Sequence, residues 1–118
     1  MKPSVWGPIT WNLLHTIAEK IYPDKFNQIK PDLPNIINYI CSSIPCPVCR
    51  KHAAIYIKSN SIHSLQTREE LILYLFNFHN VANTNSKKSM CNTDVLNQYK
   101  NFAISNTLNI YINLYSKN

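Results

Sequence analysis

The chain has 118 residues, of which 45% are hydrophobic and 15% charged, and its formal net charge is +6. This length and composition are typical of one globular domain with a single core, and they exclude a disordered chain. Its one glycine is Gly7. Because P-loops and Rossmann dinucleotide sites need several glycines between a strand and a helix, both kinds of phosphate site are excluded.

The first segment contains neither a long apolar run nor a small-residue cleavage site, and no apolar stretch is long enough to span a membrane. We therefore expect a soluble, non-secreted, cytoplasmic protein without membrane contact. The basic residues are scattered, so a solvated basic surface is the simplest interpretation, and a phosphate-bearing ligand is the sharper alternative. Nucleic acid is disfavoured because basic and aromatic residues do not interleave along any helix face.

The hydrophobic period is helical almost throughout the chain. A first helix is predicted from Pro8, a residue suited to the first helical position, to just before Pro23. A second helix is predicted between Pro31 and Pro45, with an unbroken apolar stripe along one face.

A third helix is expected to begin at Cys46 or Pro47 and to end near Lys58. Thr67 and Glu70 have the spacing of a capping box before the apolar run LILYLFNF, which predicts a fourth helix over about 68–83. After a polar, loop-like segment, a final helix is predicted from about 93 to 115. No segment alternates with a period of two, so no sheet is expected. With short connections, the sequence predicts an all-α fold over residues 1–118, namely an up-and-down four-helix bundle with an additional fifth C-terminal helix.

Cys46 and Cys49 lie at the predicted start of the third helix. Backbone N–H groups without partners and the positive end of the helix dipole stabilise a thiolate there, and Arg50 and Lys51 add positive charge. A bridge between these cysteines closes a very short ring, which gives little stabilisation as a structural staple. Repeated cycling between dithiol and disulfide is therefore the favoured interpretation.

A zinc site is the main alternative for these cysteines. Cys41, Cys46, Cys49 and His52 are close in sequence and are ligand types that zinc prefers, which would make the chain a zinc-stabilised helical binding module. Against this interpretation, Cys41 falls on the apolar stripe of the second helix, and no second C-x-x-C follows. A cofactor-free thiol–disulfide carrier is a further alternative. A thioredoxin-like domain is disfavoured because no strand precedes the pair.

Two predicted helices carry flat rings and amides at helical spacing. Trp11 and His15 share one face of the first helix, and His79 and Asn83 share one face of the fourth, with Asn80 beside them. If the two faces meet, these groups suit stacking and edge recognition of a flat heterocycle between helices.

Lys87 and Lys88 follow that fourth helix by about one turn. In this position their ammonium groups could meet a pyrophosphate.

The segments WGPITWNLLHTIAEKIYPD, PCPVC and HNVANTNSKK together resemble the Erv/ALR family of sulfhydryl oxidases. The family pattern reads roughly W-x-x-L-H, C-x-x-C and H-N-x-V-N with a following lysine, and the chain is most similar to the small viral members. The resemblance implies a FAD-dependent enzyme, usually a homodimer, with FAD held between helices at one end of the bundle. It also implies that dithiol-containing protein substrates are oxidised to disulfides and that O2 is reduced to H2O2. The abundance of Asn, Ile, Lys and Tyr fits an A/T-rich genome, which agrees with a viral source and a host-cytoplasmic location.

Carried over residue by residue, the resemblance makes Cys46 the cysteine that exchanges with substrate and Cys49 the cysteine against the flavin. With the spacing arguments above, the residues assigned to FAD binding are Gly7, Trp11, His15, Tyr22, Cys49, His79, Asn80, Asn83, Lys87 and Lys88. No metal site is implied. Cellular relatives commonly fasten the fifth helix by a second disulfide, but here no cysteine follows Cys91. Cys41 is interpreted as a buried small hydrophobe.

Overall fold

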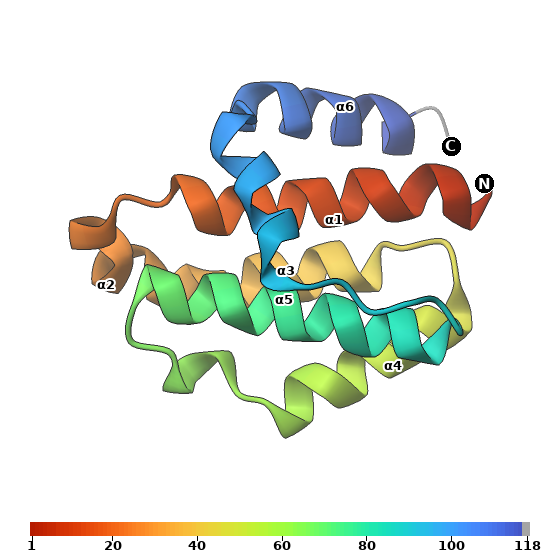
Figure 1. The fold of residues 1–118 in the computed structure, drawn as a ribbon, viewed down its shortest axis with the longest axis horizontal. Coiled ribbons are helices and arrows are strands. Elements are labelled where there is room, and N and C mark those ends of the chain that lie inside the picture. Colours follow the sequence, from red (N-terminus) through yellow and green to blue (C-terminus); the bar gives the residue numbers. More distant parts are fainter. Residues whose placement is uncertain (117–118) are drawn as a thin grey trace.

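The computed structural model describes residues 1–116, and every regular element in that range is helical (Figure 1). The α-helices are α1 (Pro3–Lys20), α2 (Phe26–Ile29), α3 (Leu33–Ser42), α4 (Pro47–Ser59), α5 (Arg68–Asn85) and α6 (Ile104–Ser116). The 3₁₀ segments are η1 (Pro23–Lys25), η2 (Lys30–Asp32), η3 (Ile62–Ser64) and η4 (Thr93–Asn101). The all-α prediction is therefore confirmed.

The long helices form a bundle in which α1 packs against both α5 and α6, while α3 packs against α4 and α4 against α5 (Figure 1). Helix α6 lies alongside α1 and runs in the opposite direction, as the additional C-terminal helix of the prediction. None of the helices within residues 1–116 combines the length and apolarity needed to cross a bilayer.

Helix α1 begins five residues earlier than predicted, because Pro3 rather than Pro8 occupies the first turn. Pro8 lies inside the helix and lacks the N–H that would bond to the carbonyl of Ser4. Ser4 is exposed at the helix start, so water can donate to that carbonyl instead. The longer helix carries Trp6 and Gly7 on its first two turns, which places both beside the functional site described below.

The segment after α5 also differs from the prediction. The expected single helix over about 93–115 is divided into η4 and α6, and Phe102 between them has an extended backbone, with φ −82° and ψ 140°. This bend allows η4 to pack across α1 with Tyr99 buried, while α6 packs along α1. A straight helix could not make both contacts.

The core is built from the apolar faces of α1, α3 and α5. Its most buried members include Leu13, Leu14, Ala18, Leu33, Ile37, Leu71, Leu75 and Phe78. Complete burial of a large apolar side chain contributes roughly 1.5–3 kcal/mol, so this cluster fixes how the three helices sit against one another.

The start of α5 is set by side-chain capping, close to the predicted capping box. The Glu70 N–H donates to Thr67 Oγ1 over 3.1 Å, and the Glu70 carboxylate accepts from the Gln66 N–H over 2.9 Å. The carboxylate thus reaches one residue further back than a standard capping box requires. These caps define where α5 begins and hence which of its side chains face α1.

Candidate functional site

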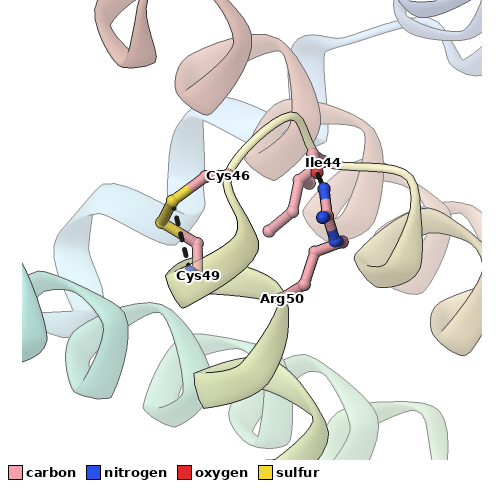
Figure 2. Close-up of a disulfide and its surroundings, with 4 residues drawn as sticks. All are labelled: Ile44, Cys46, Cys49 and Arg50. Atoms are coloured by element: carbon pink, nitrogen blue, oxygen red, sulfur yellow. Dashed lines mark hydrogen bonds between the residues drawn. A yellow bond between two sulfur atoms is a disulfide. The ribbon is translucent and has the colours of Figure 1, made fainter.

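Cys46 and Cys49 are joined by a disulfide at the start of α4, with Cα atoms 5.2 Å apart (Figure 2). Cys46 is the N-cap of the helix, and its Sγ accepts a hydrogen bond from the Cys49 backbone N–H over 3.2 Å. Pro47 occupies the first helical position, which is one of the two starts that the sequence predicts. Both sulfurs therefore lie in the first turn, at the positive end of the helix dipole, which is a position that stabilises a thiolate.

Arg50 fixes the segment that leads into the disulfide. Its Nη1 donates to the carbonyl oxygen of Ile44 over 2.7 Å, and Figure 2 shows its side chain and the disulfide on different sides of the connecting backbone. The sequence suggested that the charge of Arg50 would lie near the sulfurs. In the structure the guanidinium holds the turn before Cys46 onto α4 through this hydrogen bond.

A cavity of about 450 Å³ opens where the start of α1, the start of α4 and the end of α5 meet. This volume lies in the range of small-molecule and cofactor sites. The predicted FAD-binding residues that border it are Gly7, Trp11, Cys49, His79, Asn83 and Lys88. Cys49, and not Cys46, is the sulfur-bearing residue of the pair at this cavity.

Several residues at the cavity were not among those predicted to bind FAD. Trp6, Cys41, His52 and Tyr99 all border it. Trp6 lay within the first segment that resembles the family pattern, so its position was a signal that could have been used. Tyr99 had no such signal, because the bend after η4 brings it to the site.

Rings from α1 and α5 stack directly on each other. Trp11 and His79 have centroids 4.1 Å apart and an interplanar angle of 5°, and His15 stacks on Tyr99 at 4.6 Å. A heterocycle between two rings would separate them by roughly 7 Å, twice the usual carbon–carbon contact. A flat ligand therefore cannot lie between Trp11 and His79, although it can lie against their stack.

The two histidines share a hydrogen bond, with His15 Nε2 and His79 Nδ1 3.0 Å apart. Burial, and then the neighbouring His79, lowers the pKa of His15 to about 3. Burial, and then the charge of Lys88, lowers the pKa of His79 to about 4. Both rings are consequently neutral near pH 7, and positive charge at the cavity comes from Lys88.

Four of the predicted FAD-binding residues do not border the cavity. His15 lies behind the wall, against Trp11 and His79. The side chain of Asn80 bonds to the loop that follows α5, and Lys87 is exposed in that loop. Tyr22 lies just beyond the far end of α1 and is 73% exposed, so the structure does not bring it to the site.

The end of α5 is closed by a Schellman motif that directs the chain back toward the cavity. The Lys88 N–H donates to the Asn83 carbonyl over 2.7 Å and the Lys87 N–H to the Thr84 carbonyl over 3.1 Å. Lys87 takes the left-handed conformation that this motif requires, with φ 60°. As a result Lys87 remains in solvent and Lys88 borders the cavity.

Asn80 closes the same loop through both ends of its side-chain amide. Its Nδ2 donates to the Cys91 carbonyl over 3.0 Å, and its Oδ1 accepts from the Cys91 N–H over 2.9 Å. Asn80 is therefore placed as a support of the loop that contains Lys88.

The zinc alternative is not supported. Cys46 and Cys49 are bonded to each other, and within residues 1–116 no three His, Cys, Asp or Glu side chains gather in a way that could hold a metal ion. Burial raises the pKa of the free thiol of Cys41 to about 12, whereas the free cysteine Cys91 is exposed.

Comparison with known proteins gives a family assignment. The sequence profile of the Erv1/Alr family matches residues 8–102, which include α1 from Pro8 onward, the disulfide, α5 and η4. The chain belongs to the Erv1/Alr family. The resemblance read from the three sequence motifs is thus confirmed.

Among Erv1/Alr relatives, the FAD-linked sulfhydryl oxidase of African swine fever virus is 31% identical over 109 residues, which cover 88% of this chain and 84% of the relative. A protein of Invertebrate iridescent virus 3, described as a candidate FAD-linked sulfhydryl oxidase, is 31% identical over 73% of this chain and 59% of its own length. The mitochondrial FAD-linked sulfhydryl oxidase ERV1 of Saccharomyces cerevisiae is 29% identical over 70% of this chain and 43% of its own length. The comparison with solved structures gives no match.

Proposed function

We propose that this chain, as one domain over residues 1–118, is a FAD-linked sulfhydryl oxidase that forms disulfides in protein substrates and reduces O2 to H2O2. The observation that carries the proposal is a disulfide at the head of α4 whose Cys49 borders a cofactor-sized cavity. Its relatives in the Erv1/Alr family are named FAD-linked sulfhydryl oxidases, which supports the same activity here.

The residues around the cavity fit FAD. The stacked rings of Trp11 and His79 offer a flat apolar surface, and Lys88 offers a cation for the pyrophosphate. Trp6 also borders the cavity, and its buried indole N–H has no acceptor in the described part of the chain, so an acceptor on a ligand could satisfy it. When bound, FAD supplies a two-electron acceptor for the reduced cysteine pair and transfers those electrons to oxygen.

Substrate oxidation proceeds by two thiol–disulfide exchanges at the cysteine pair. A substrate thiolate attacks Cys46 Sγ, a mixed disulfide forms, and Cys49 leaves as a thiolate. A second substrate thiolate then attacks the substrate sulfur of the mixed disulfide, and Cys46 leaves as a thiolate. The substrate thus loses two electrons and gains a disulfide, while the pair gains the two electrons. The start of α4 stabilises both leaving thiolates.

The roles of the other site residues follow from their positions. We assign FAD contacts to the bordering residues Gly7, Trp11, His79, Asn83 and Lys88.

His15 supports His79 through their hydrogen bond, and Asn80 supports the loop that carries Lys88. Neither side chain is assigned a contact with the flavin.

The activity is tested with cysteine variants. Cys46→Ser and Cys49→Ser should each abolish thiol-dependent oxygen consumption while FAD, measured by visible absorbance, stays bound. Cys91→Ser is the matched control, because Cys91 is a free, exposed cysteine that does not border the cavity, and it should turn over normally. Normal turnover by either variant of the pair would contradict the proposal.

The spectrum of the purified protein separates the proposed oxidase from the other classes. An oxidase should be yellow, with about one FAD per chain. A colourless protein with bound zinc would favour the binding module, and a colourless, metal-free protein that consumes no oxygen would favour a thiol–disulfide carrier.

We also propose a homodimer, because an apolar groove remains open between α1, α3 and α6. The groove holds about 570 Å³, and its side chains include Tyr39, Leu108 and Ile112, which are 70%, 42% and 49% exposed. Exposed apolar patches of this kind commonly mark protein interfaces. Light scattering should give twice the chain mass of 13.7 kDa, and Leu108→Asp should give the monomer mass. A monomeric parent protein would refute this part of the proposal.

The similarity to viral enzymes supports a viral source, and we propose the host cytoplasm as the place of action. Fractionation of infected cells with an antibody to this chain would test the location. Recovery only from secreted material or membranes would contradict it.

A further inference from the structure

Charged side chains are unevenly distributed between the two ends of the bundle. Five of the six carboxylates lie in elements at one end: Glu19 in the last turn of α1, Asp24 in η1, Asp32 in η2, and Glu69 and Glu70 in the first turn of α5. Figure 1 shows these elements together at the end marked by α2, opposite the chain termini.

The other end carries the disulfide and is cationic. There the starts of α1 and α4 and the end of α5 meet (Figure 1), and the cations on or next to these segments are Lys2, Arg50, Lys51, Lys87 and Lys88. Residues 33–67 and 71–93 contain no aspartate or glutamate at all. The ion pair recorded within residues 1–116 lies at the start of α5, so none of these five cations is neutralised by a carboxylate of the described chain.

FAD accounts for only part of this charge. The pyrophosphate of the cofactor neutralises roughly two cations, and Lys88 at the cavity is placed to supply one of them. Lys51 is exposed on α4 and does not border the cavity. Its charge is therefore not taken up by FAD and is free to pair with a different negatively charged partner.

Lys51 belongs to an exposed face of α4 that begins beside the disulfide. We call this surface, made of Val48, Lys51, His52 and Ile55, the α4 face. The two apolar members are one heptad apart and are 61% and 55% exposed. At that spacing they lie on the same side of the helix, with the two basic side chains between them. The face begins two residues after Cys46, so a segment bound to it lies next to the start of α4 that carries the disulfide.

We propose that the α4 face docks protein substrates whose cysteine pair is flanked by acidic and apolar residues. The inference rests on the proposed function, because it concerns the substrate of the same disulfide. An acidic flank pairs with Lys51, and apolar residues cover Val48 and Ile55. The net charge of +6 and the lack of aspartate and glutamate in residues 33–67 and 71–93 steer such a segment toward Cys46 and repel a basic one.

The test uses two synthetic peptides with the same cysteine pair and the same apolar residues, one flanked by glutamates and one by lysines. Peptide-dependent oxygen consumption is measured for the FAD-loaded enzyme at low and high salt, and dithiothreitol serves as an uncharged dithiol. We expect a higher kcat/KM for the acidic peptide, through a lower KM, and a preference that shrinks at high salt.

Lys51→Glu should reduce the preference for the acidic peptide by roughly three- to tenfold at low salt. Lys25→Glu is the matched control, because it makes the same change of net charge on an exposed residue of η1 at the opposite end. Ile55→Ser should raise the KM of both peptides by roughly two- to fivefold. Circular dichroism and FAD content verify that each variant is folded.

The outcomes separate the two proposals. Failure of the parent protein to oxidise dithiothreitol would refute the proposed function. Oxidation of dithiothreitol with equal kcat/KM for both peptides would leave that function intact and overturn docking on the α4 face. An equal loss of preference in Lys51→Glu and Lys25→Glu would also overturn it, because the effect would then come from net charge alone.

Discussion

Closure of the loop after α5 by Asn80 gives a quantitative prediction for cofactor binding. Asn80→Ala removes the hydrogen bonds to the N–H and carbonyl of Cys91, which measure 2.9 and 3.0 Å. A typical hydrogen bond contributes about 0.5–1.5 kcal/mol net, so the closed loop loses roughly 1–3 kcal/mol relative to the open one. Lys88 lies in that loop and borders the cavity. If FAD binds only to the closed loop, this loss of roughly 1–3 kcal/mol raises the Kd for FAD by at most about 5-fold at the lower figure and about 150-fold at the higher one.

The assay is titration of the apoprotein with FAD, followed by quenching of flavin fluorescence. Asn80→Ala, Lys88→Ala and the double variant form a double-mutant cycle. Since we expect Asn80 to act through the position of Lys88, the double variant should bind little more weakly than Lys88→Ala alone. Asn80→Asp keeps the acceptor for the Cys91 N–H and loses the donor, so its Kd should be intermediate.

Two results would refute this reasoning. Unchanged FAD affinity in Asn80→Ala would show that the loop does not need the amide. Fully additive losses in the cycle would show that Asn80 acts independently of Lys88, as a direct contact with FAD would.

Three further predictions concern the surroundings of the site. Arg50→Ala should lower the free energy of unfolding in urea by about 1.5–3 kcal/mol, because a charged donor to the backbone is lost, and unchanged stability would contradict this. Burial lowers the pKa of His15 to about 3 and of His79 to about 4 from 6.5, so the unfolded chain binds more protons in that interval. Stability should therefore fall as pH drops from about 6.5 toward 4, and urea titrations that show no such fall would argue against a buried neutral pair. Iodoacetamide should label Cys91 much faster than Cys41, since burial raises the pKa of Cys41 to about 12, and peptide mass spectrometry showing equal rates would contradict its burial.

The sequence predicted the parts of the fold that depend on local signals. Pro47 and the capping residue Thr67 place the starts of α4 and α5 where the structure has them. The predicted start of α1 was wrong because both Pro3 and Pro8 suit the first turn of a helix. Only packing decides that Pro8 lies inside the helix. The bend at Phe102 was missed for a similar reason, since it serves contacts of η4 and α6 with α1.

The parts of the site that could be predicted are those in which reactive or aromatic residues are separated by a characteristic number of residues. The cysteine pair at a helix start, and a cluster on α1 and α5 that includes Trp11 and His79, follow from sequence intervals alone. Which side of each helix faces the cavity depends on rotations that spacing does not give. Asn80 was therefore assigned to the cofactor, whereas the structure bonds its side chain to a loop backbone. Tyr22 was misplaced for another reason, because it follows the end of α1 that is far from the cavity.

The sulfur of Cys46 also closes the first turn of α4, because it accepts the backbone N–H of Cys49. An acceptor atom remains at that position whether the sulfur is bonded to its neighbour, to a client or to a proton. The first turn of α4 therefore does not need to unwind between successive covalent states of Cys46. Thiol–disulfide exchange at this cysteine can then proceed with little movement of the backbone.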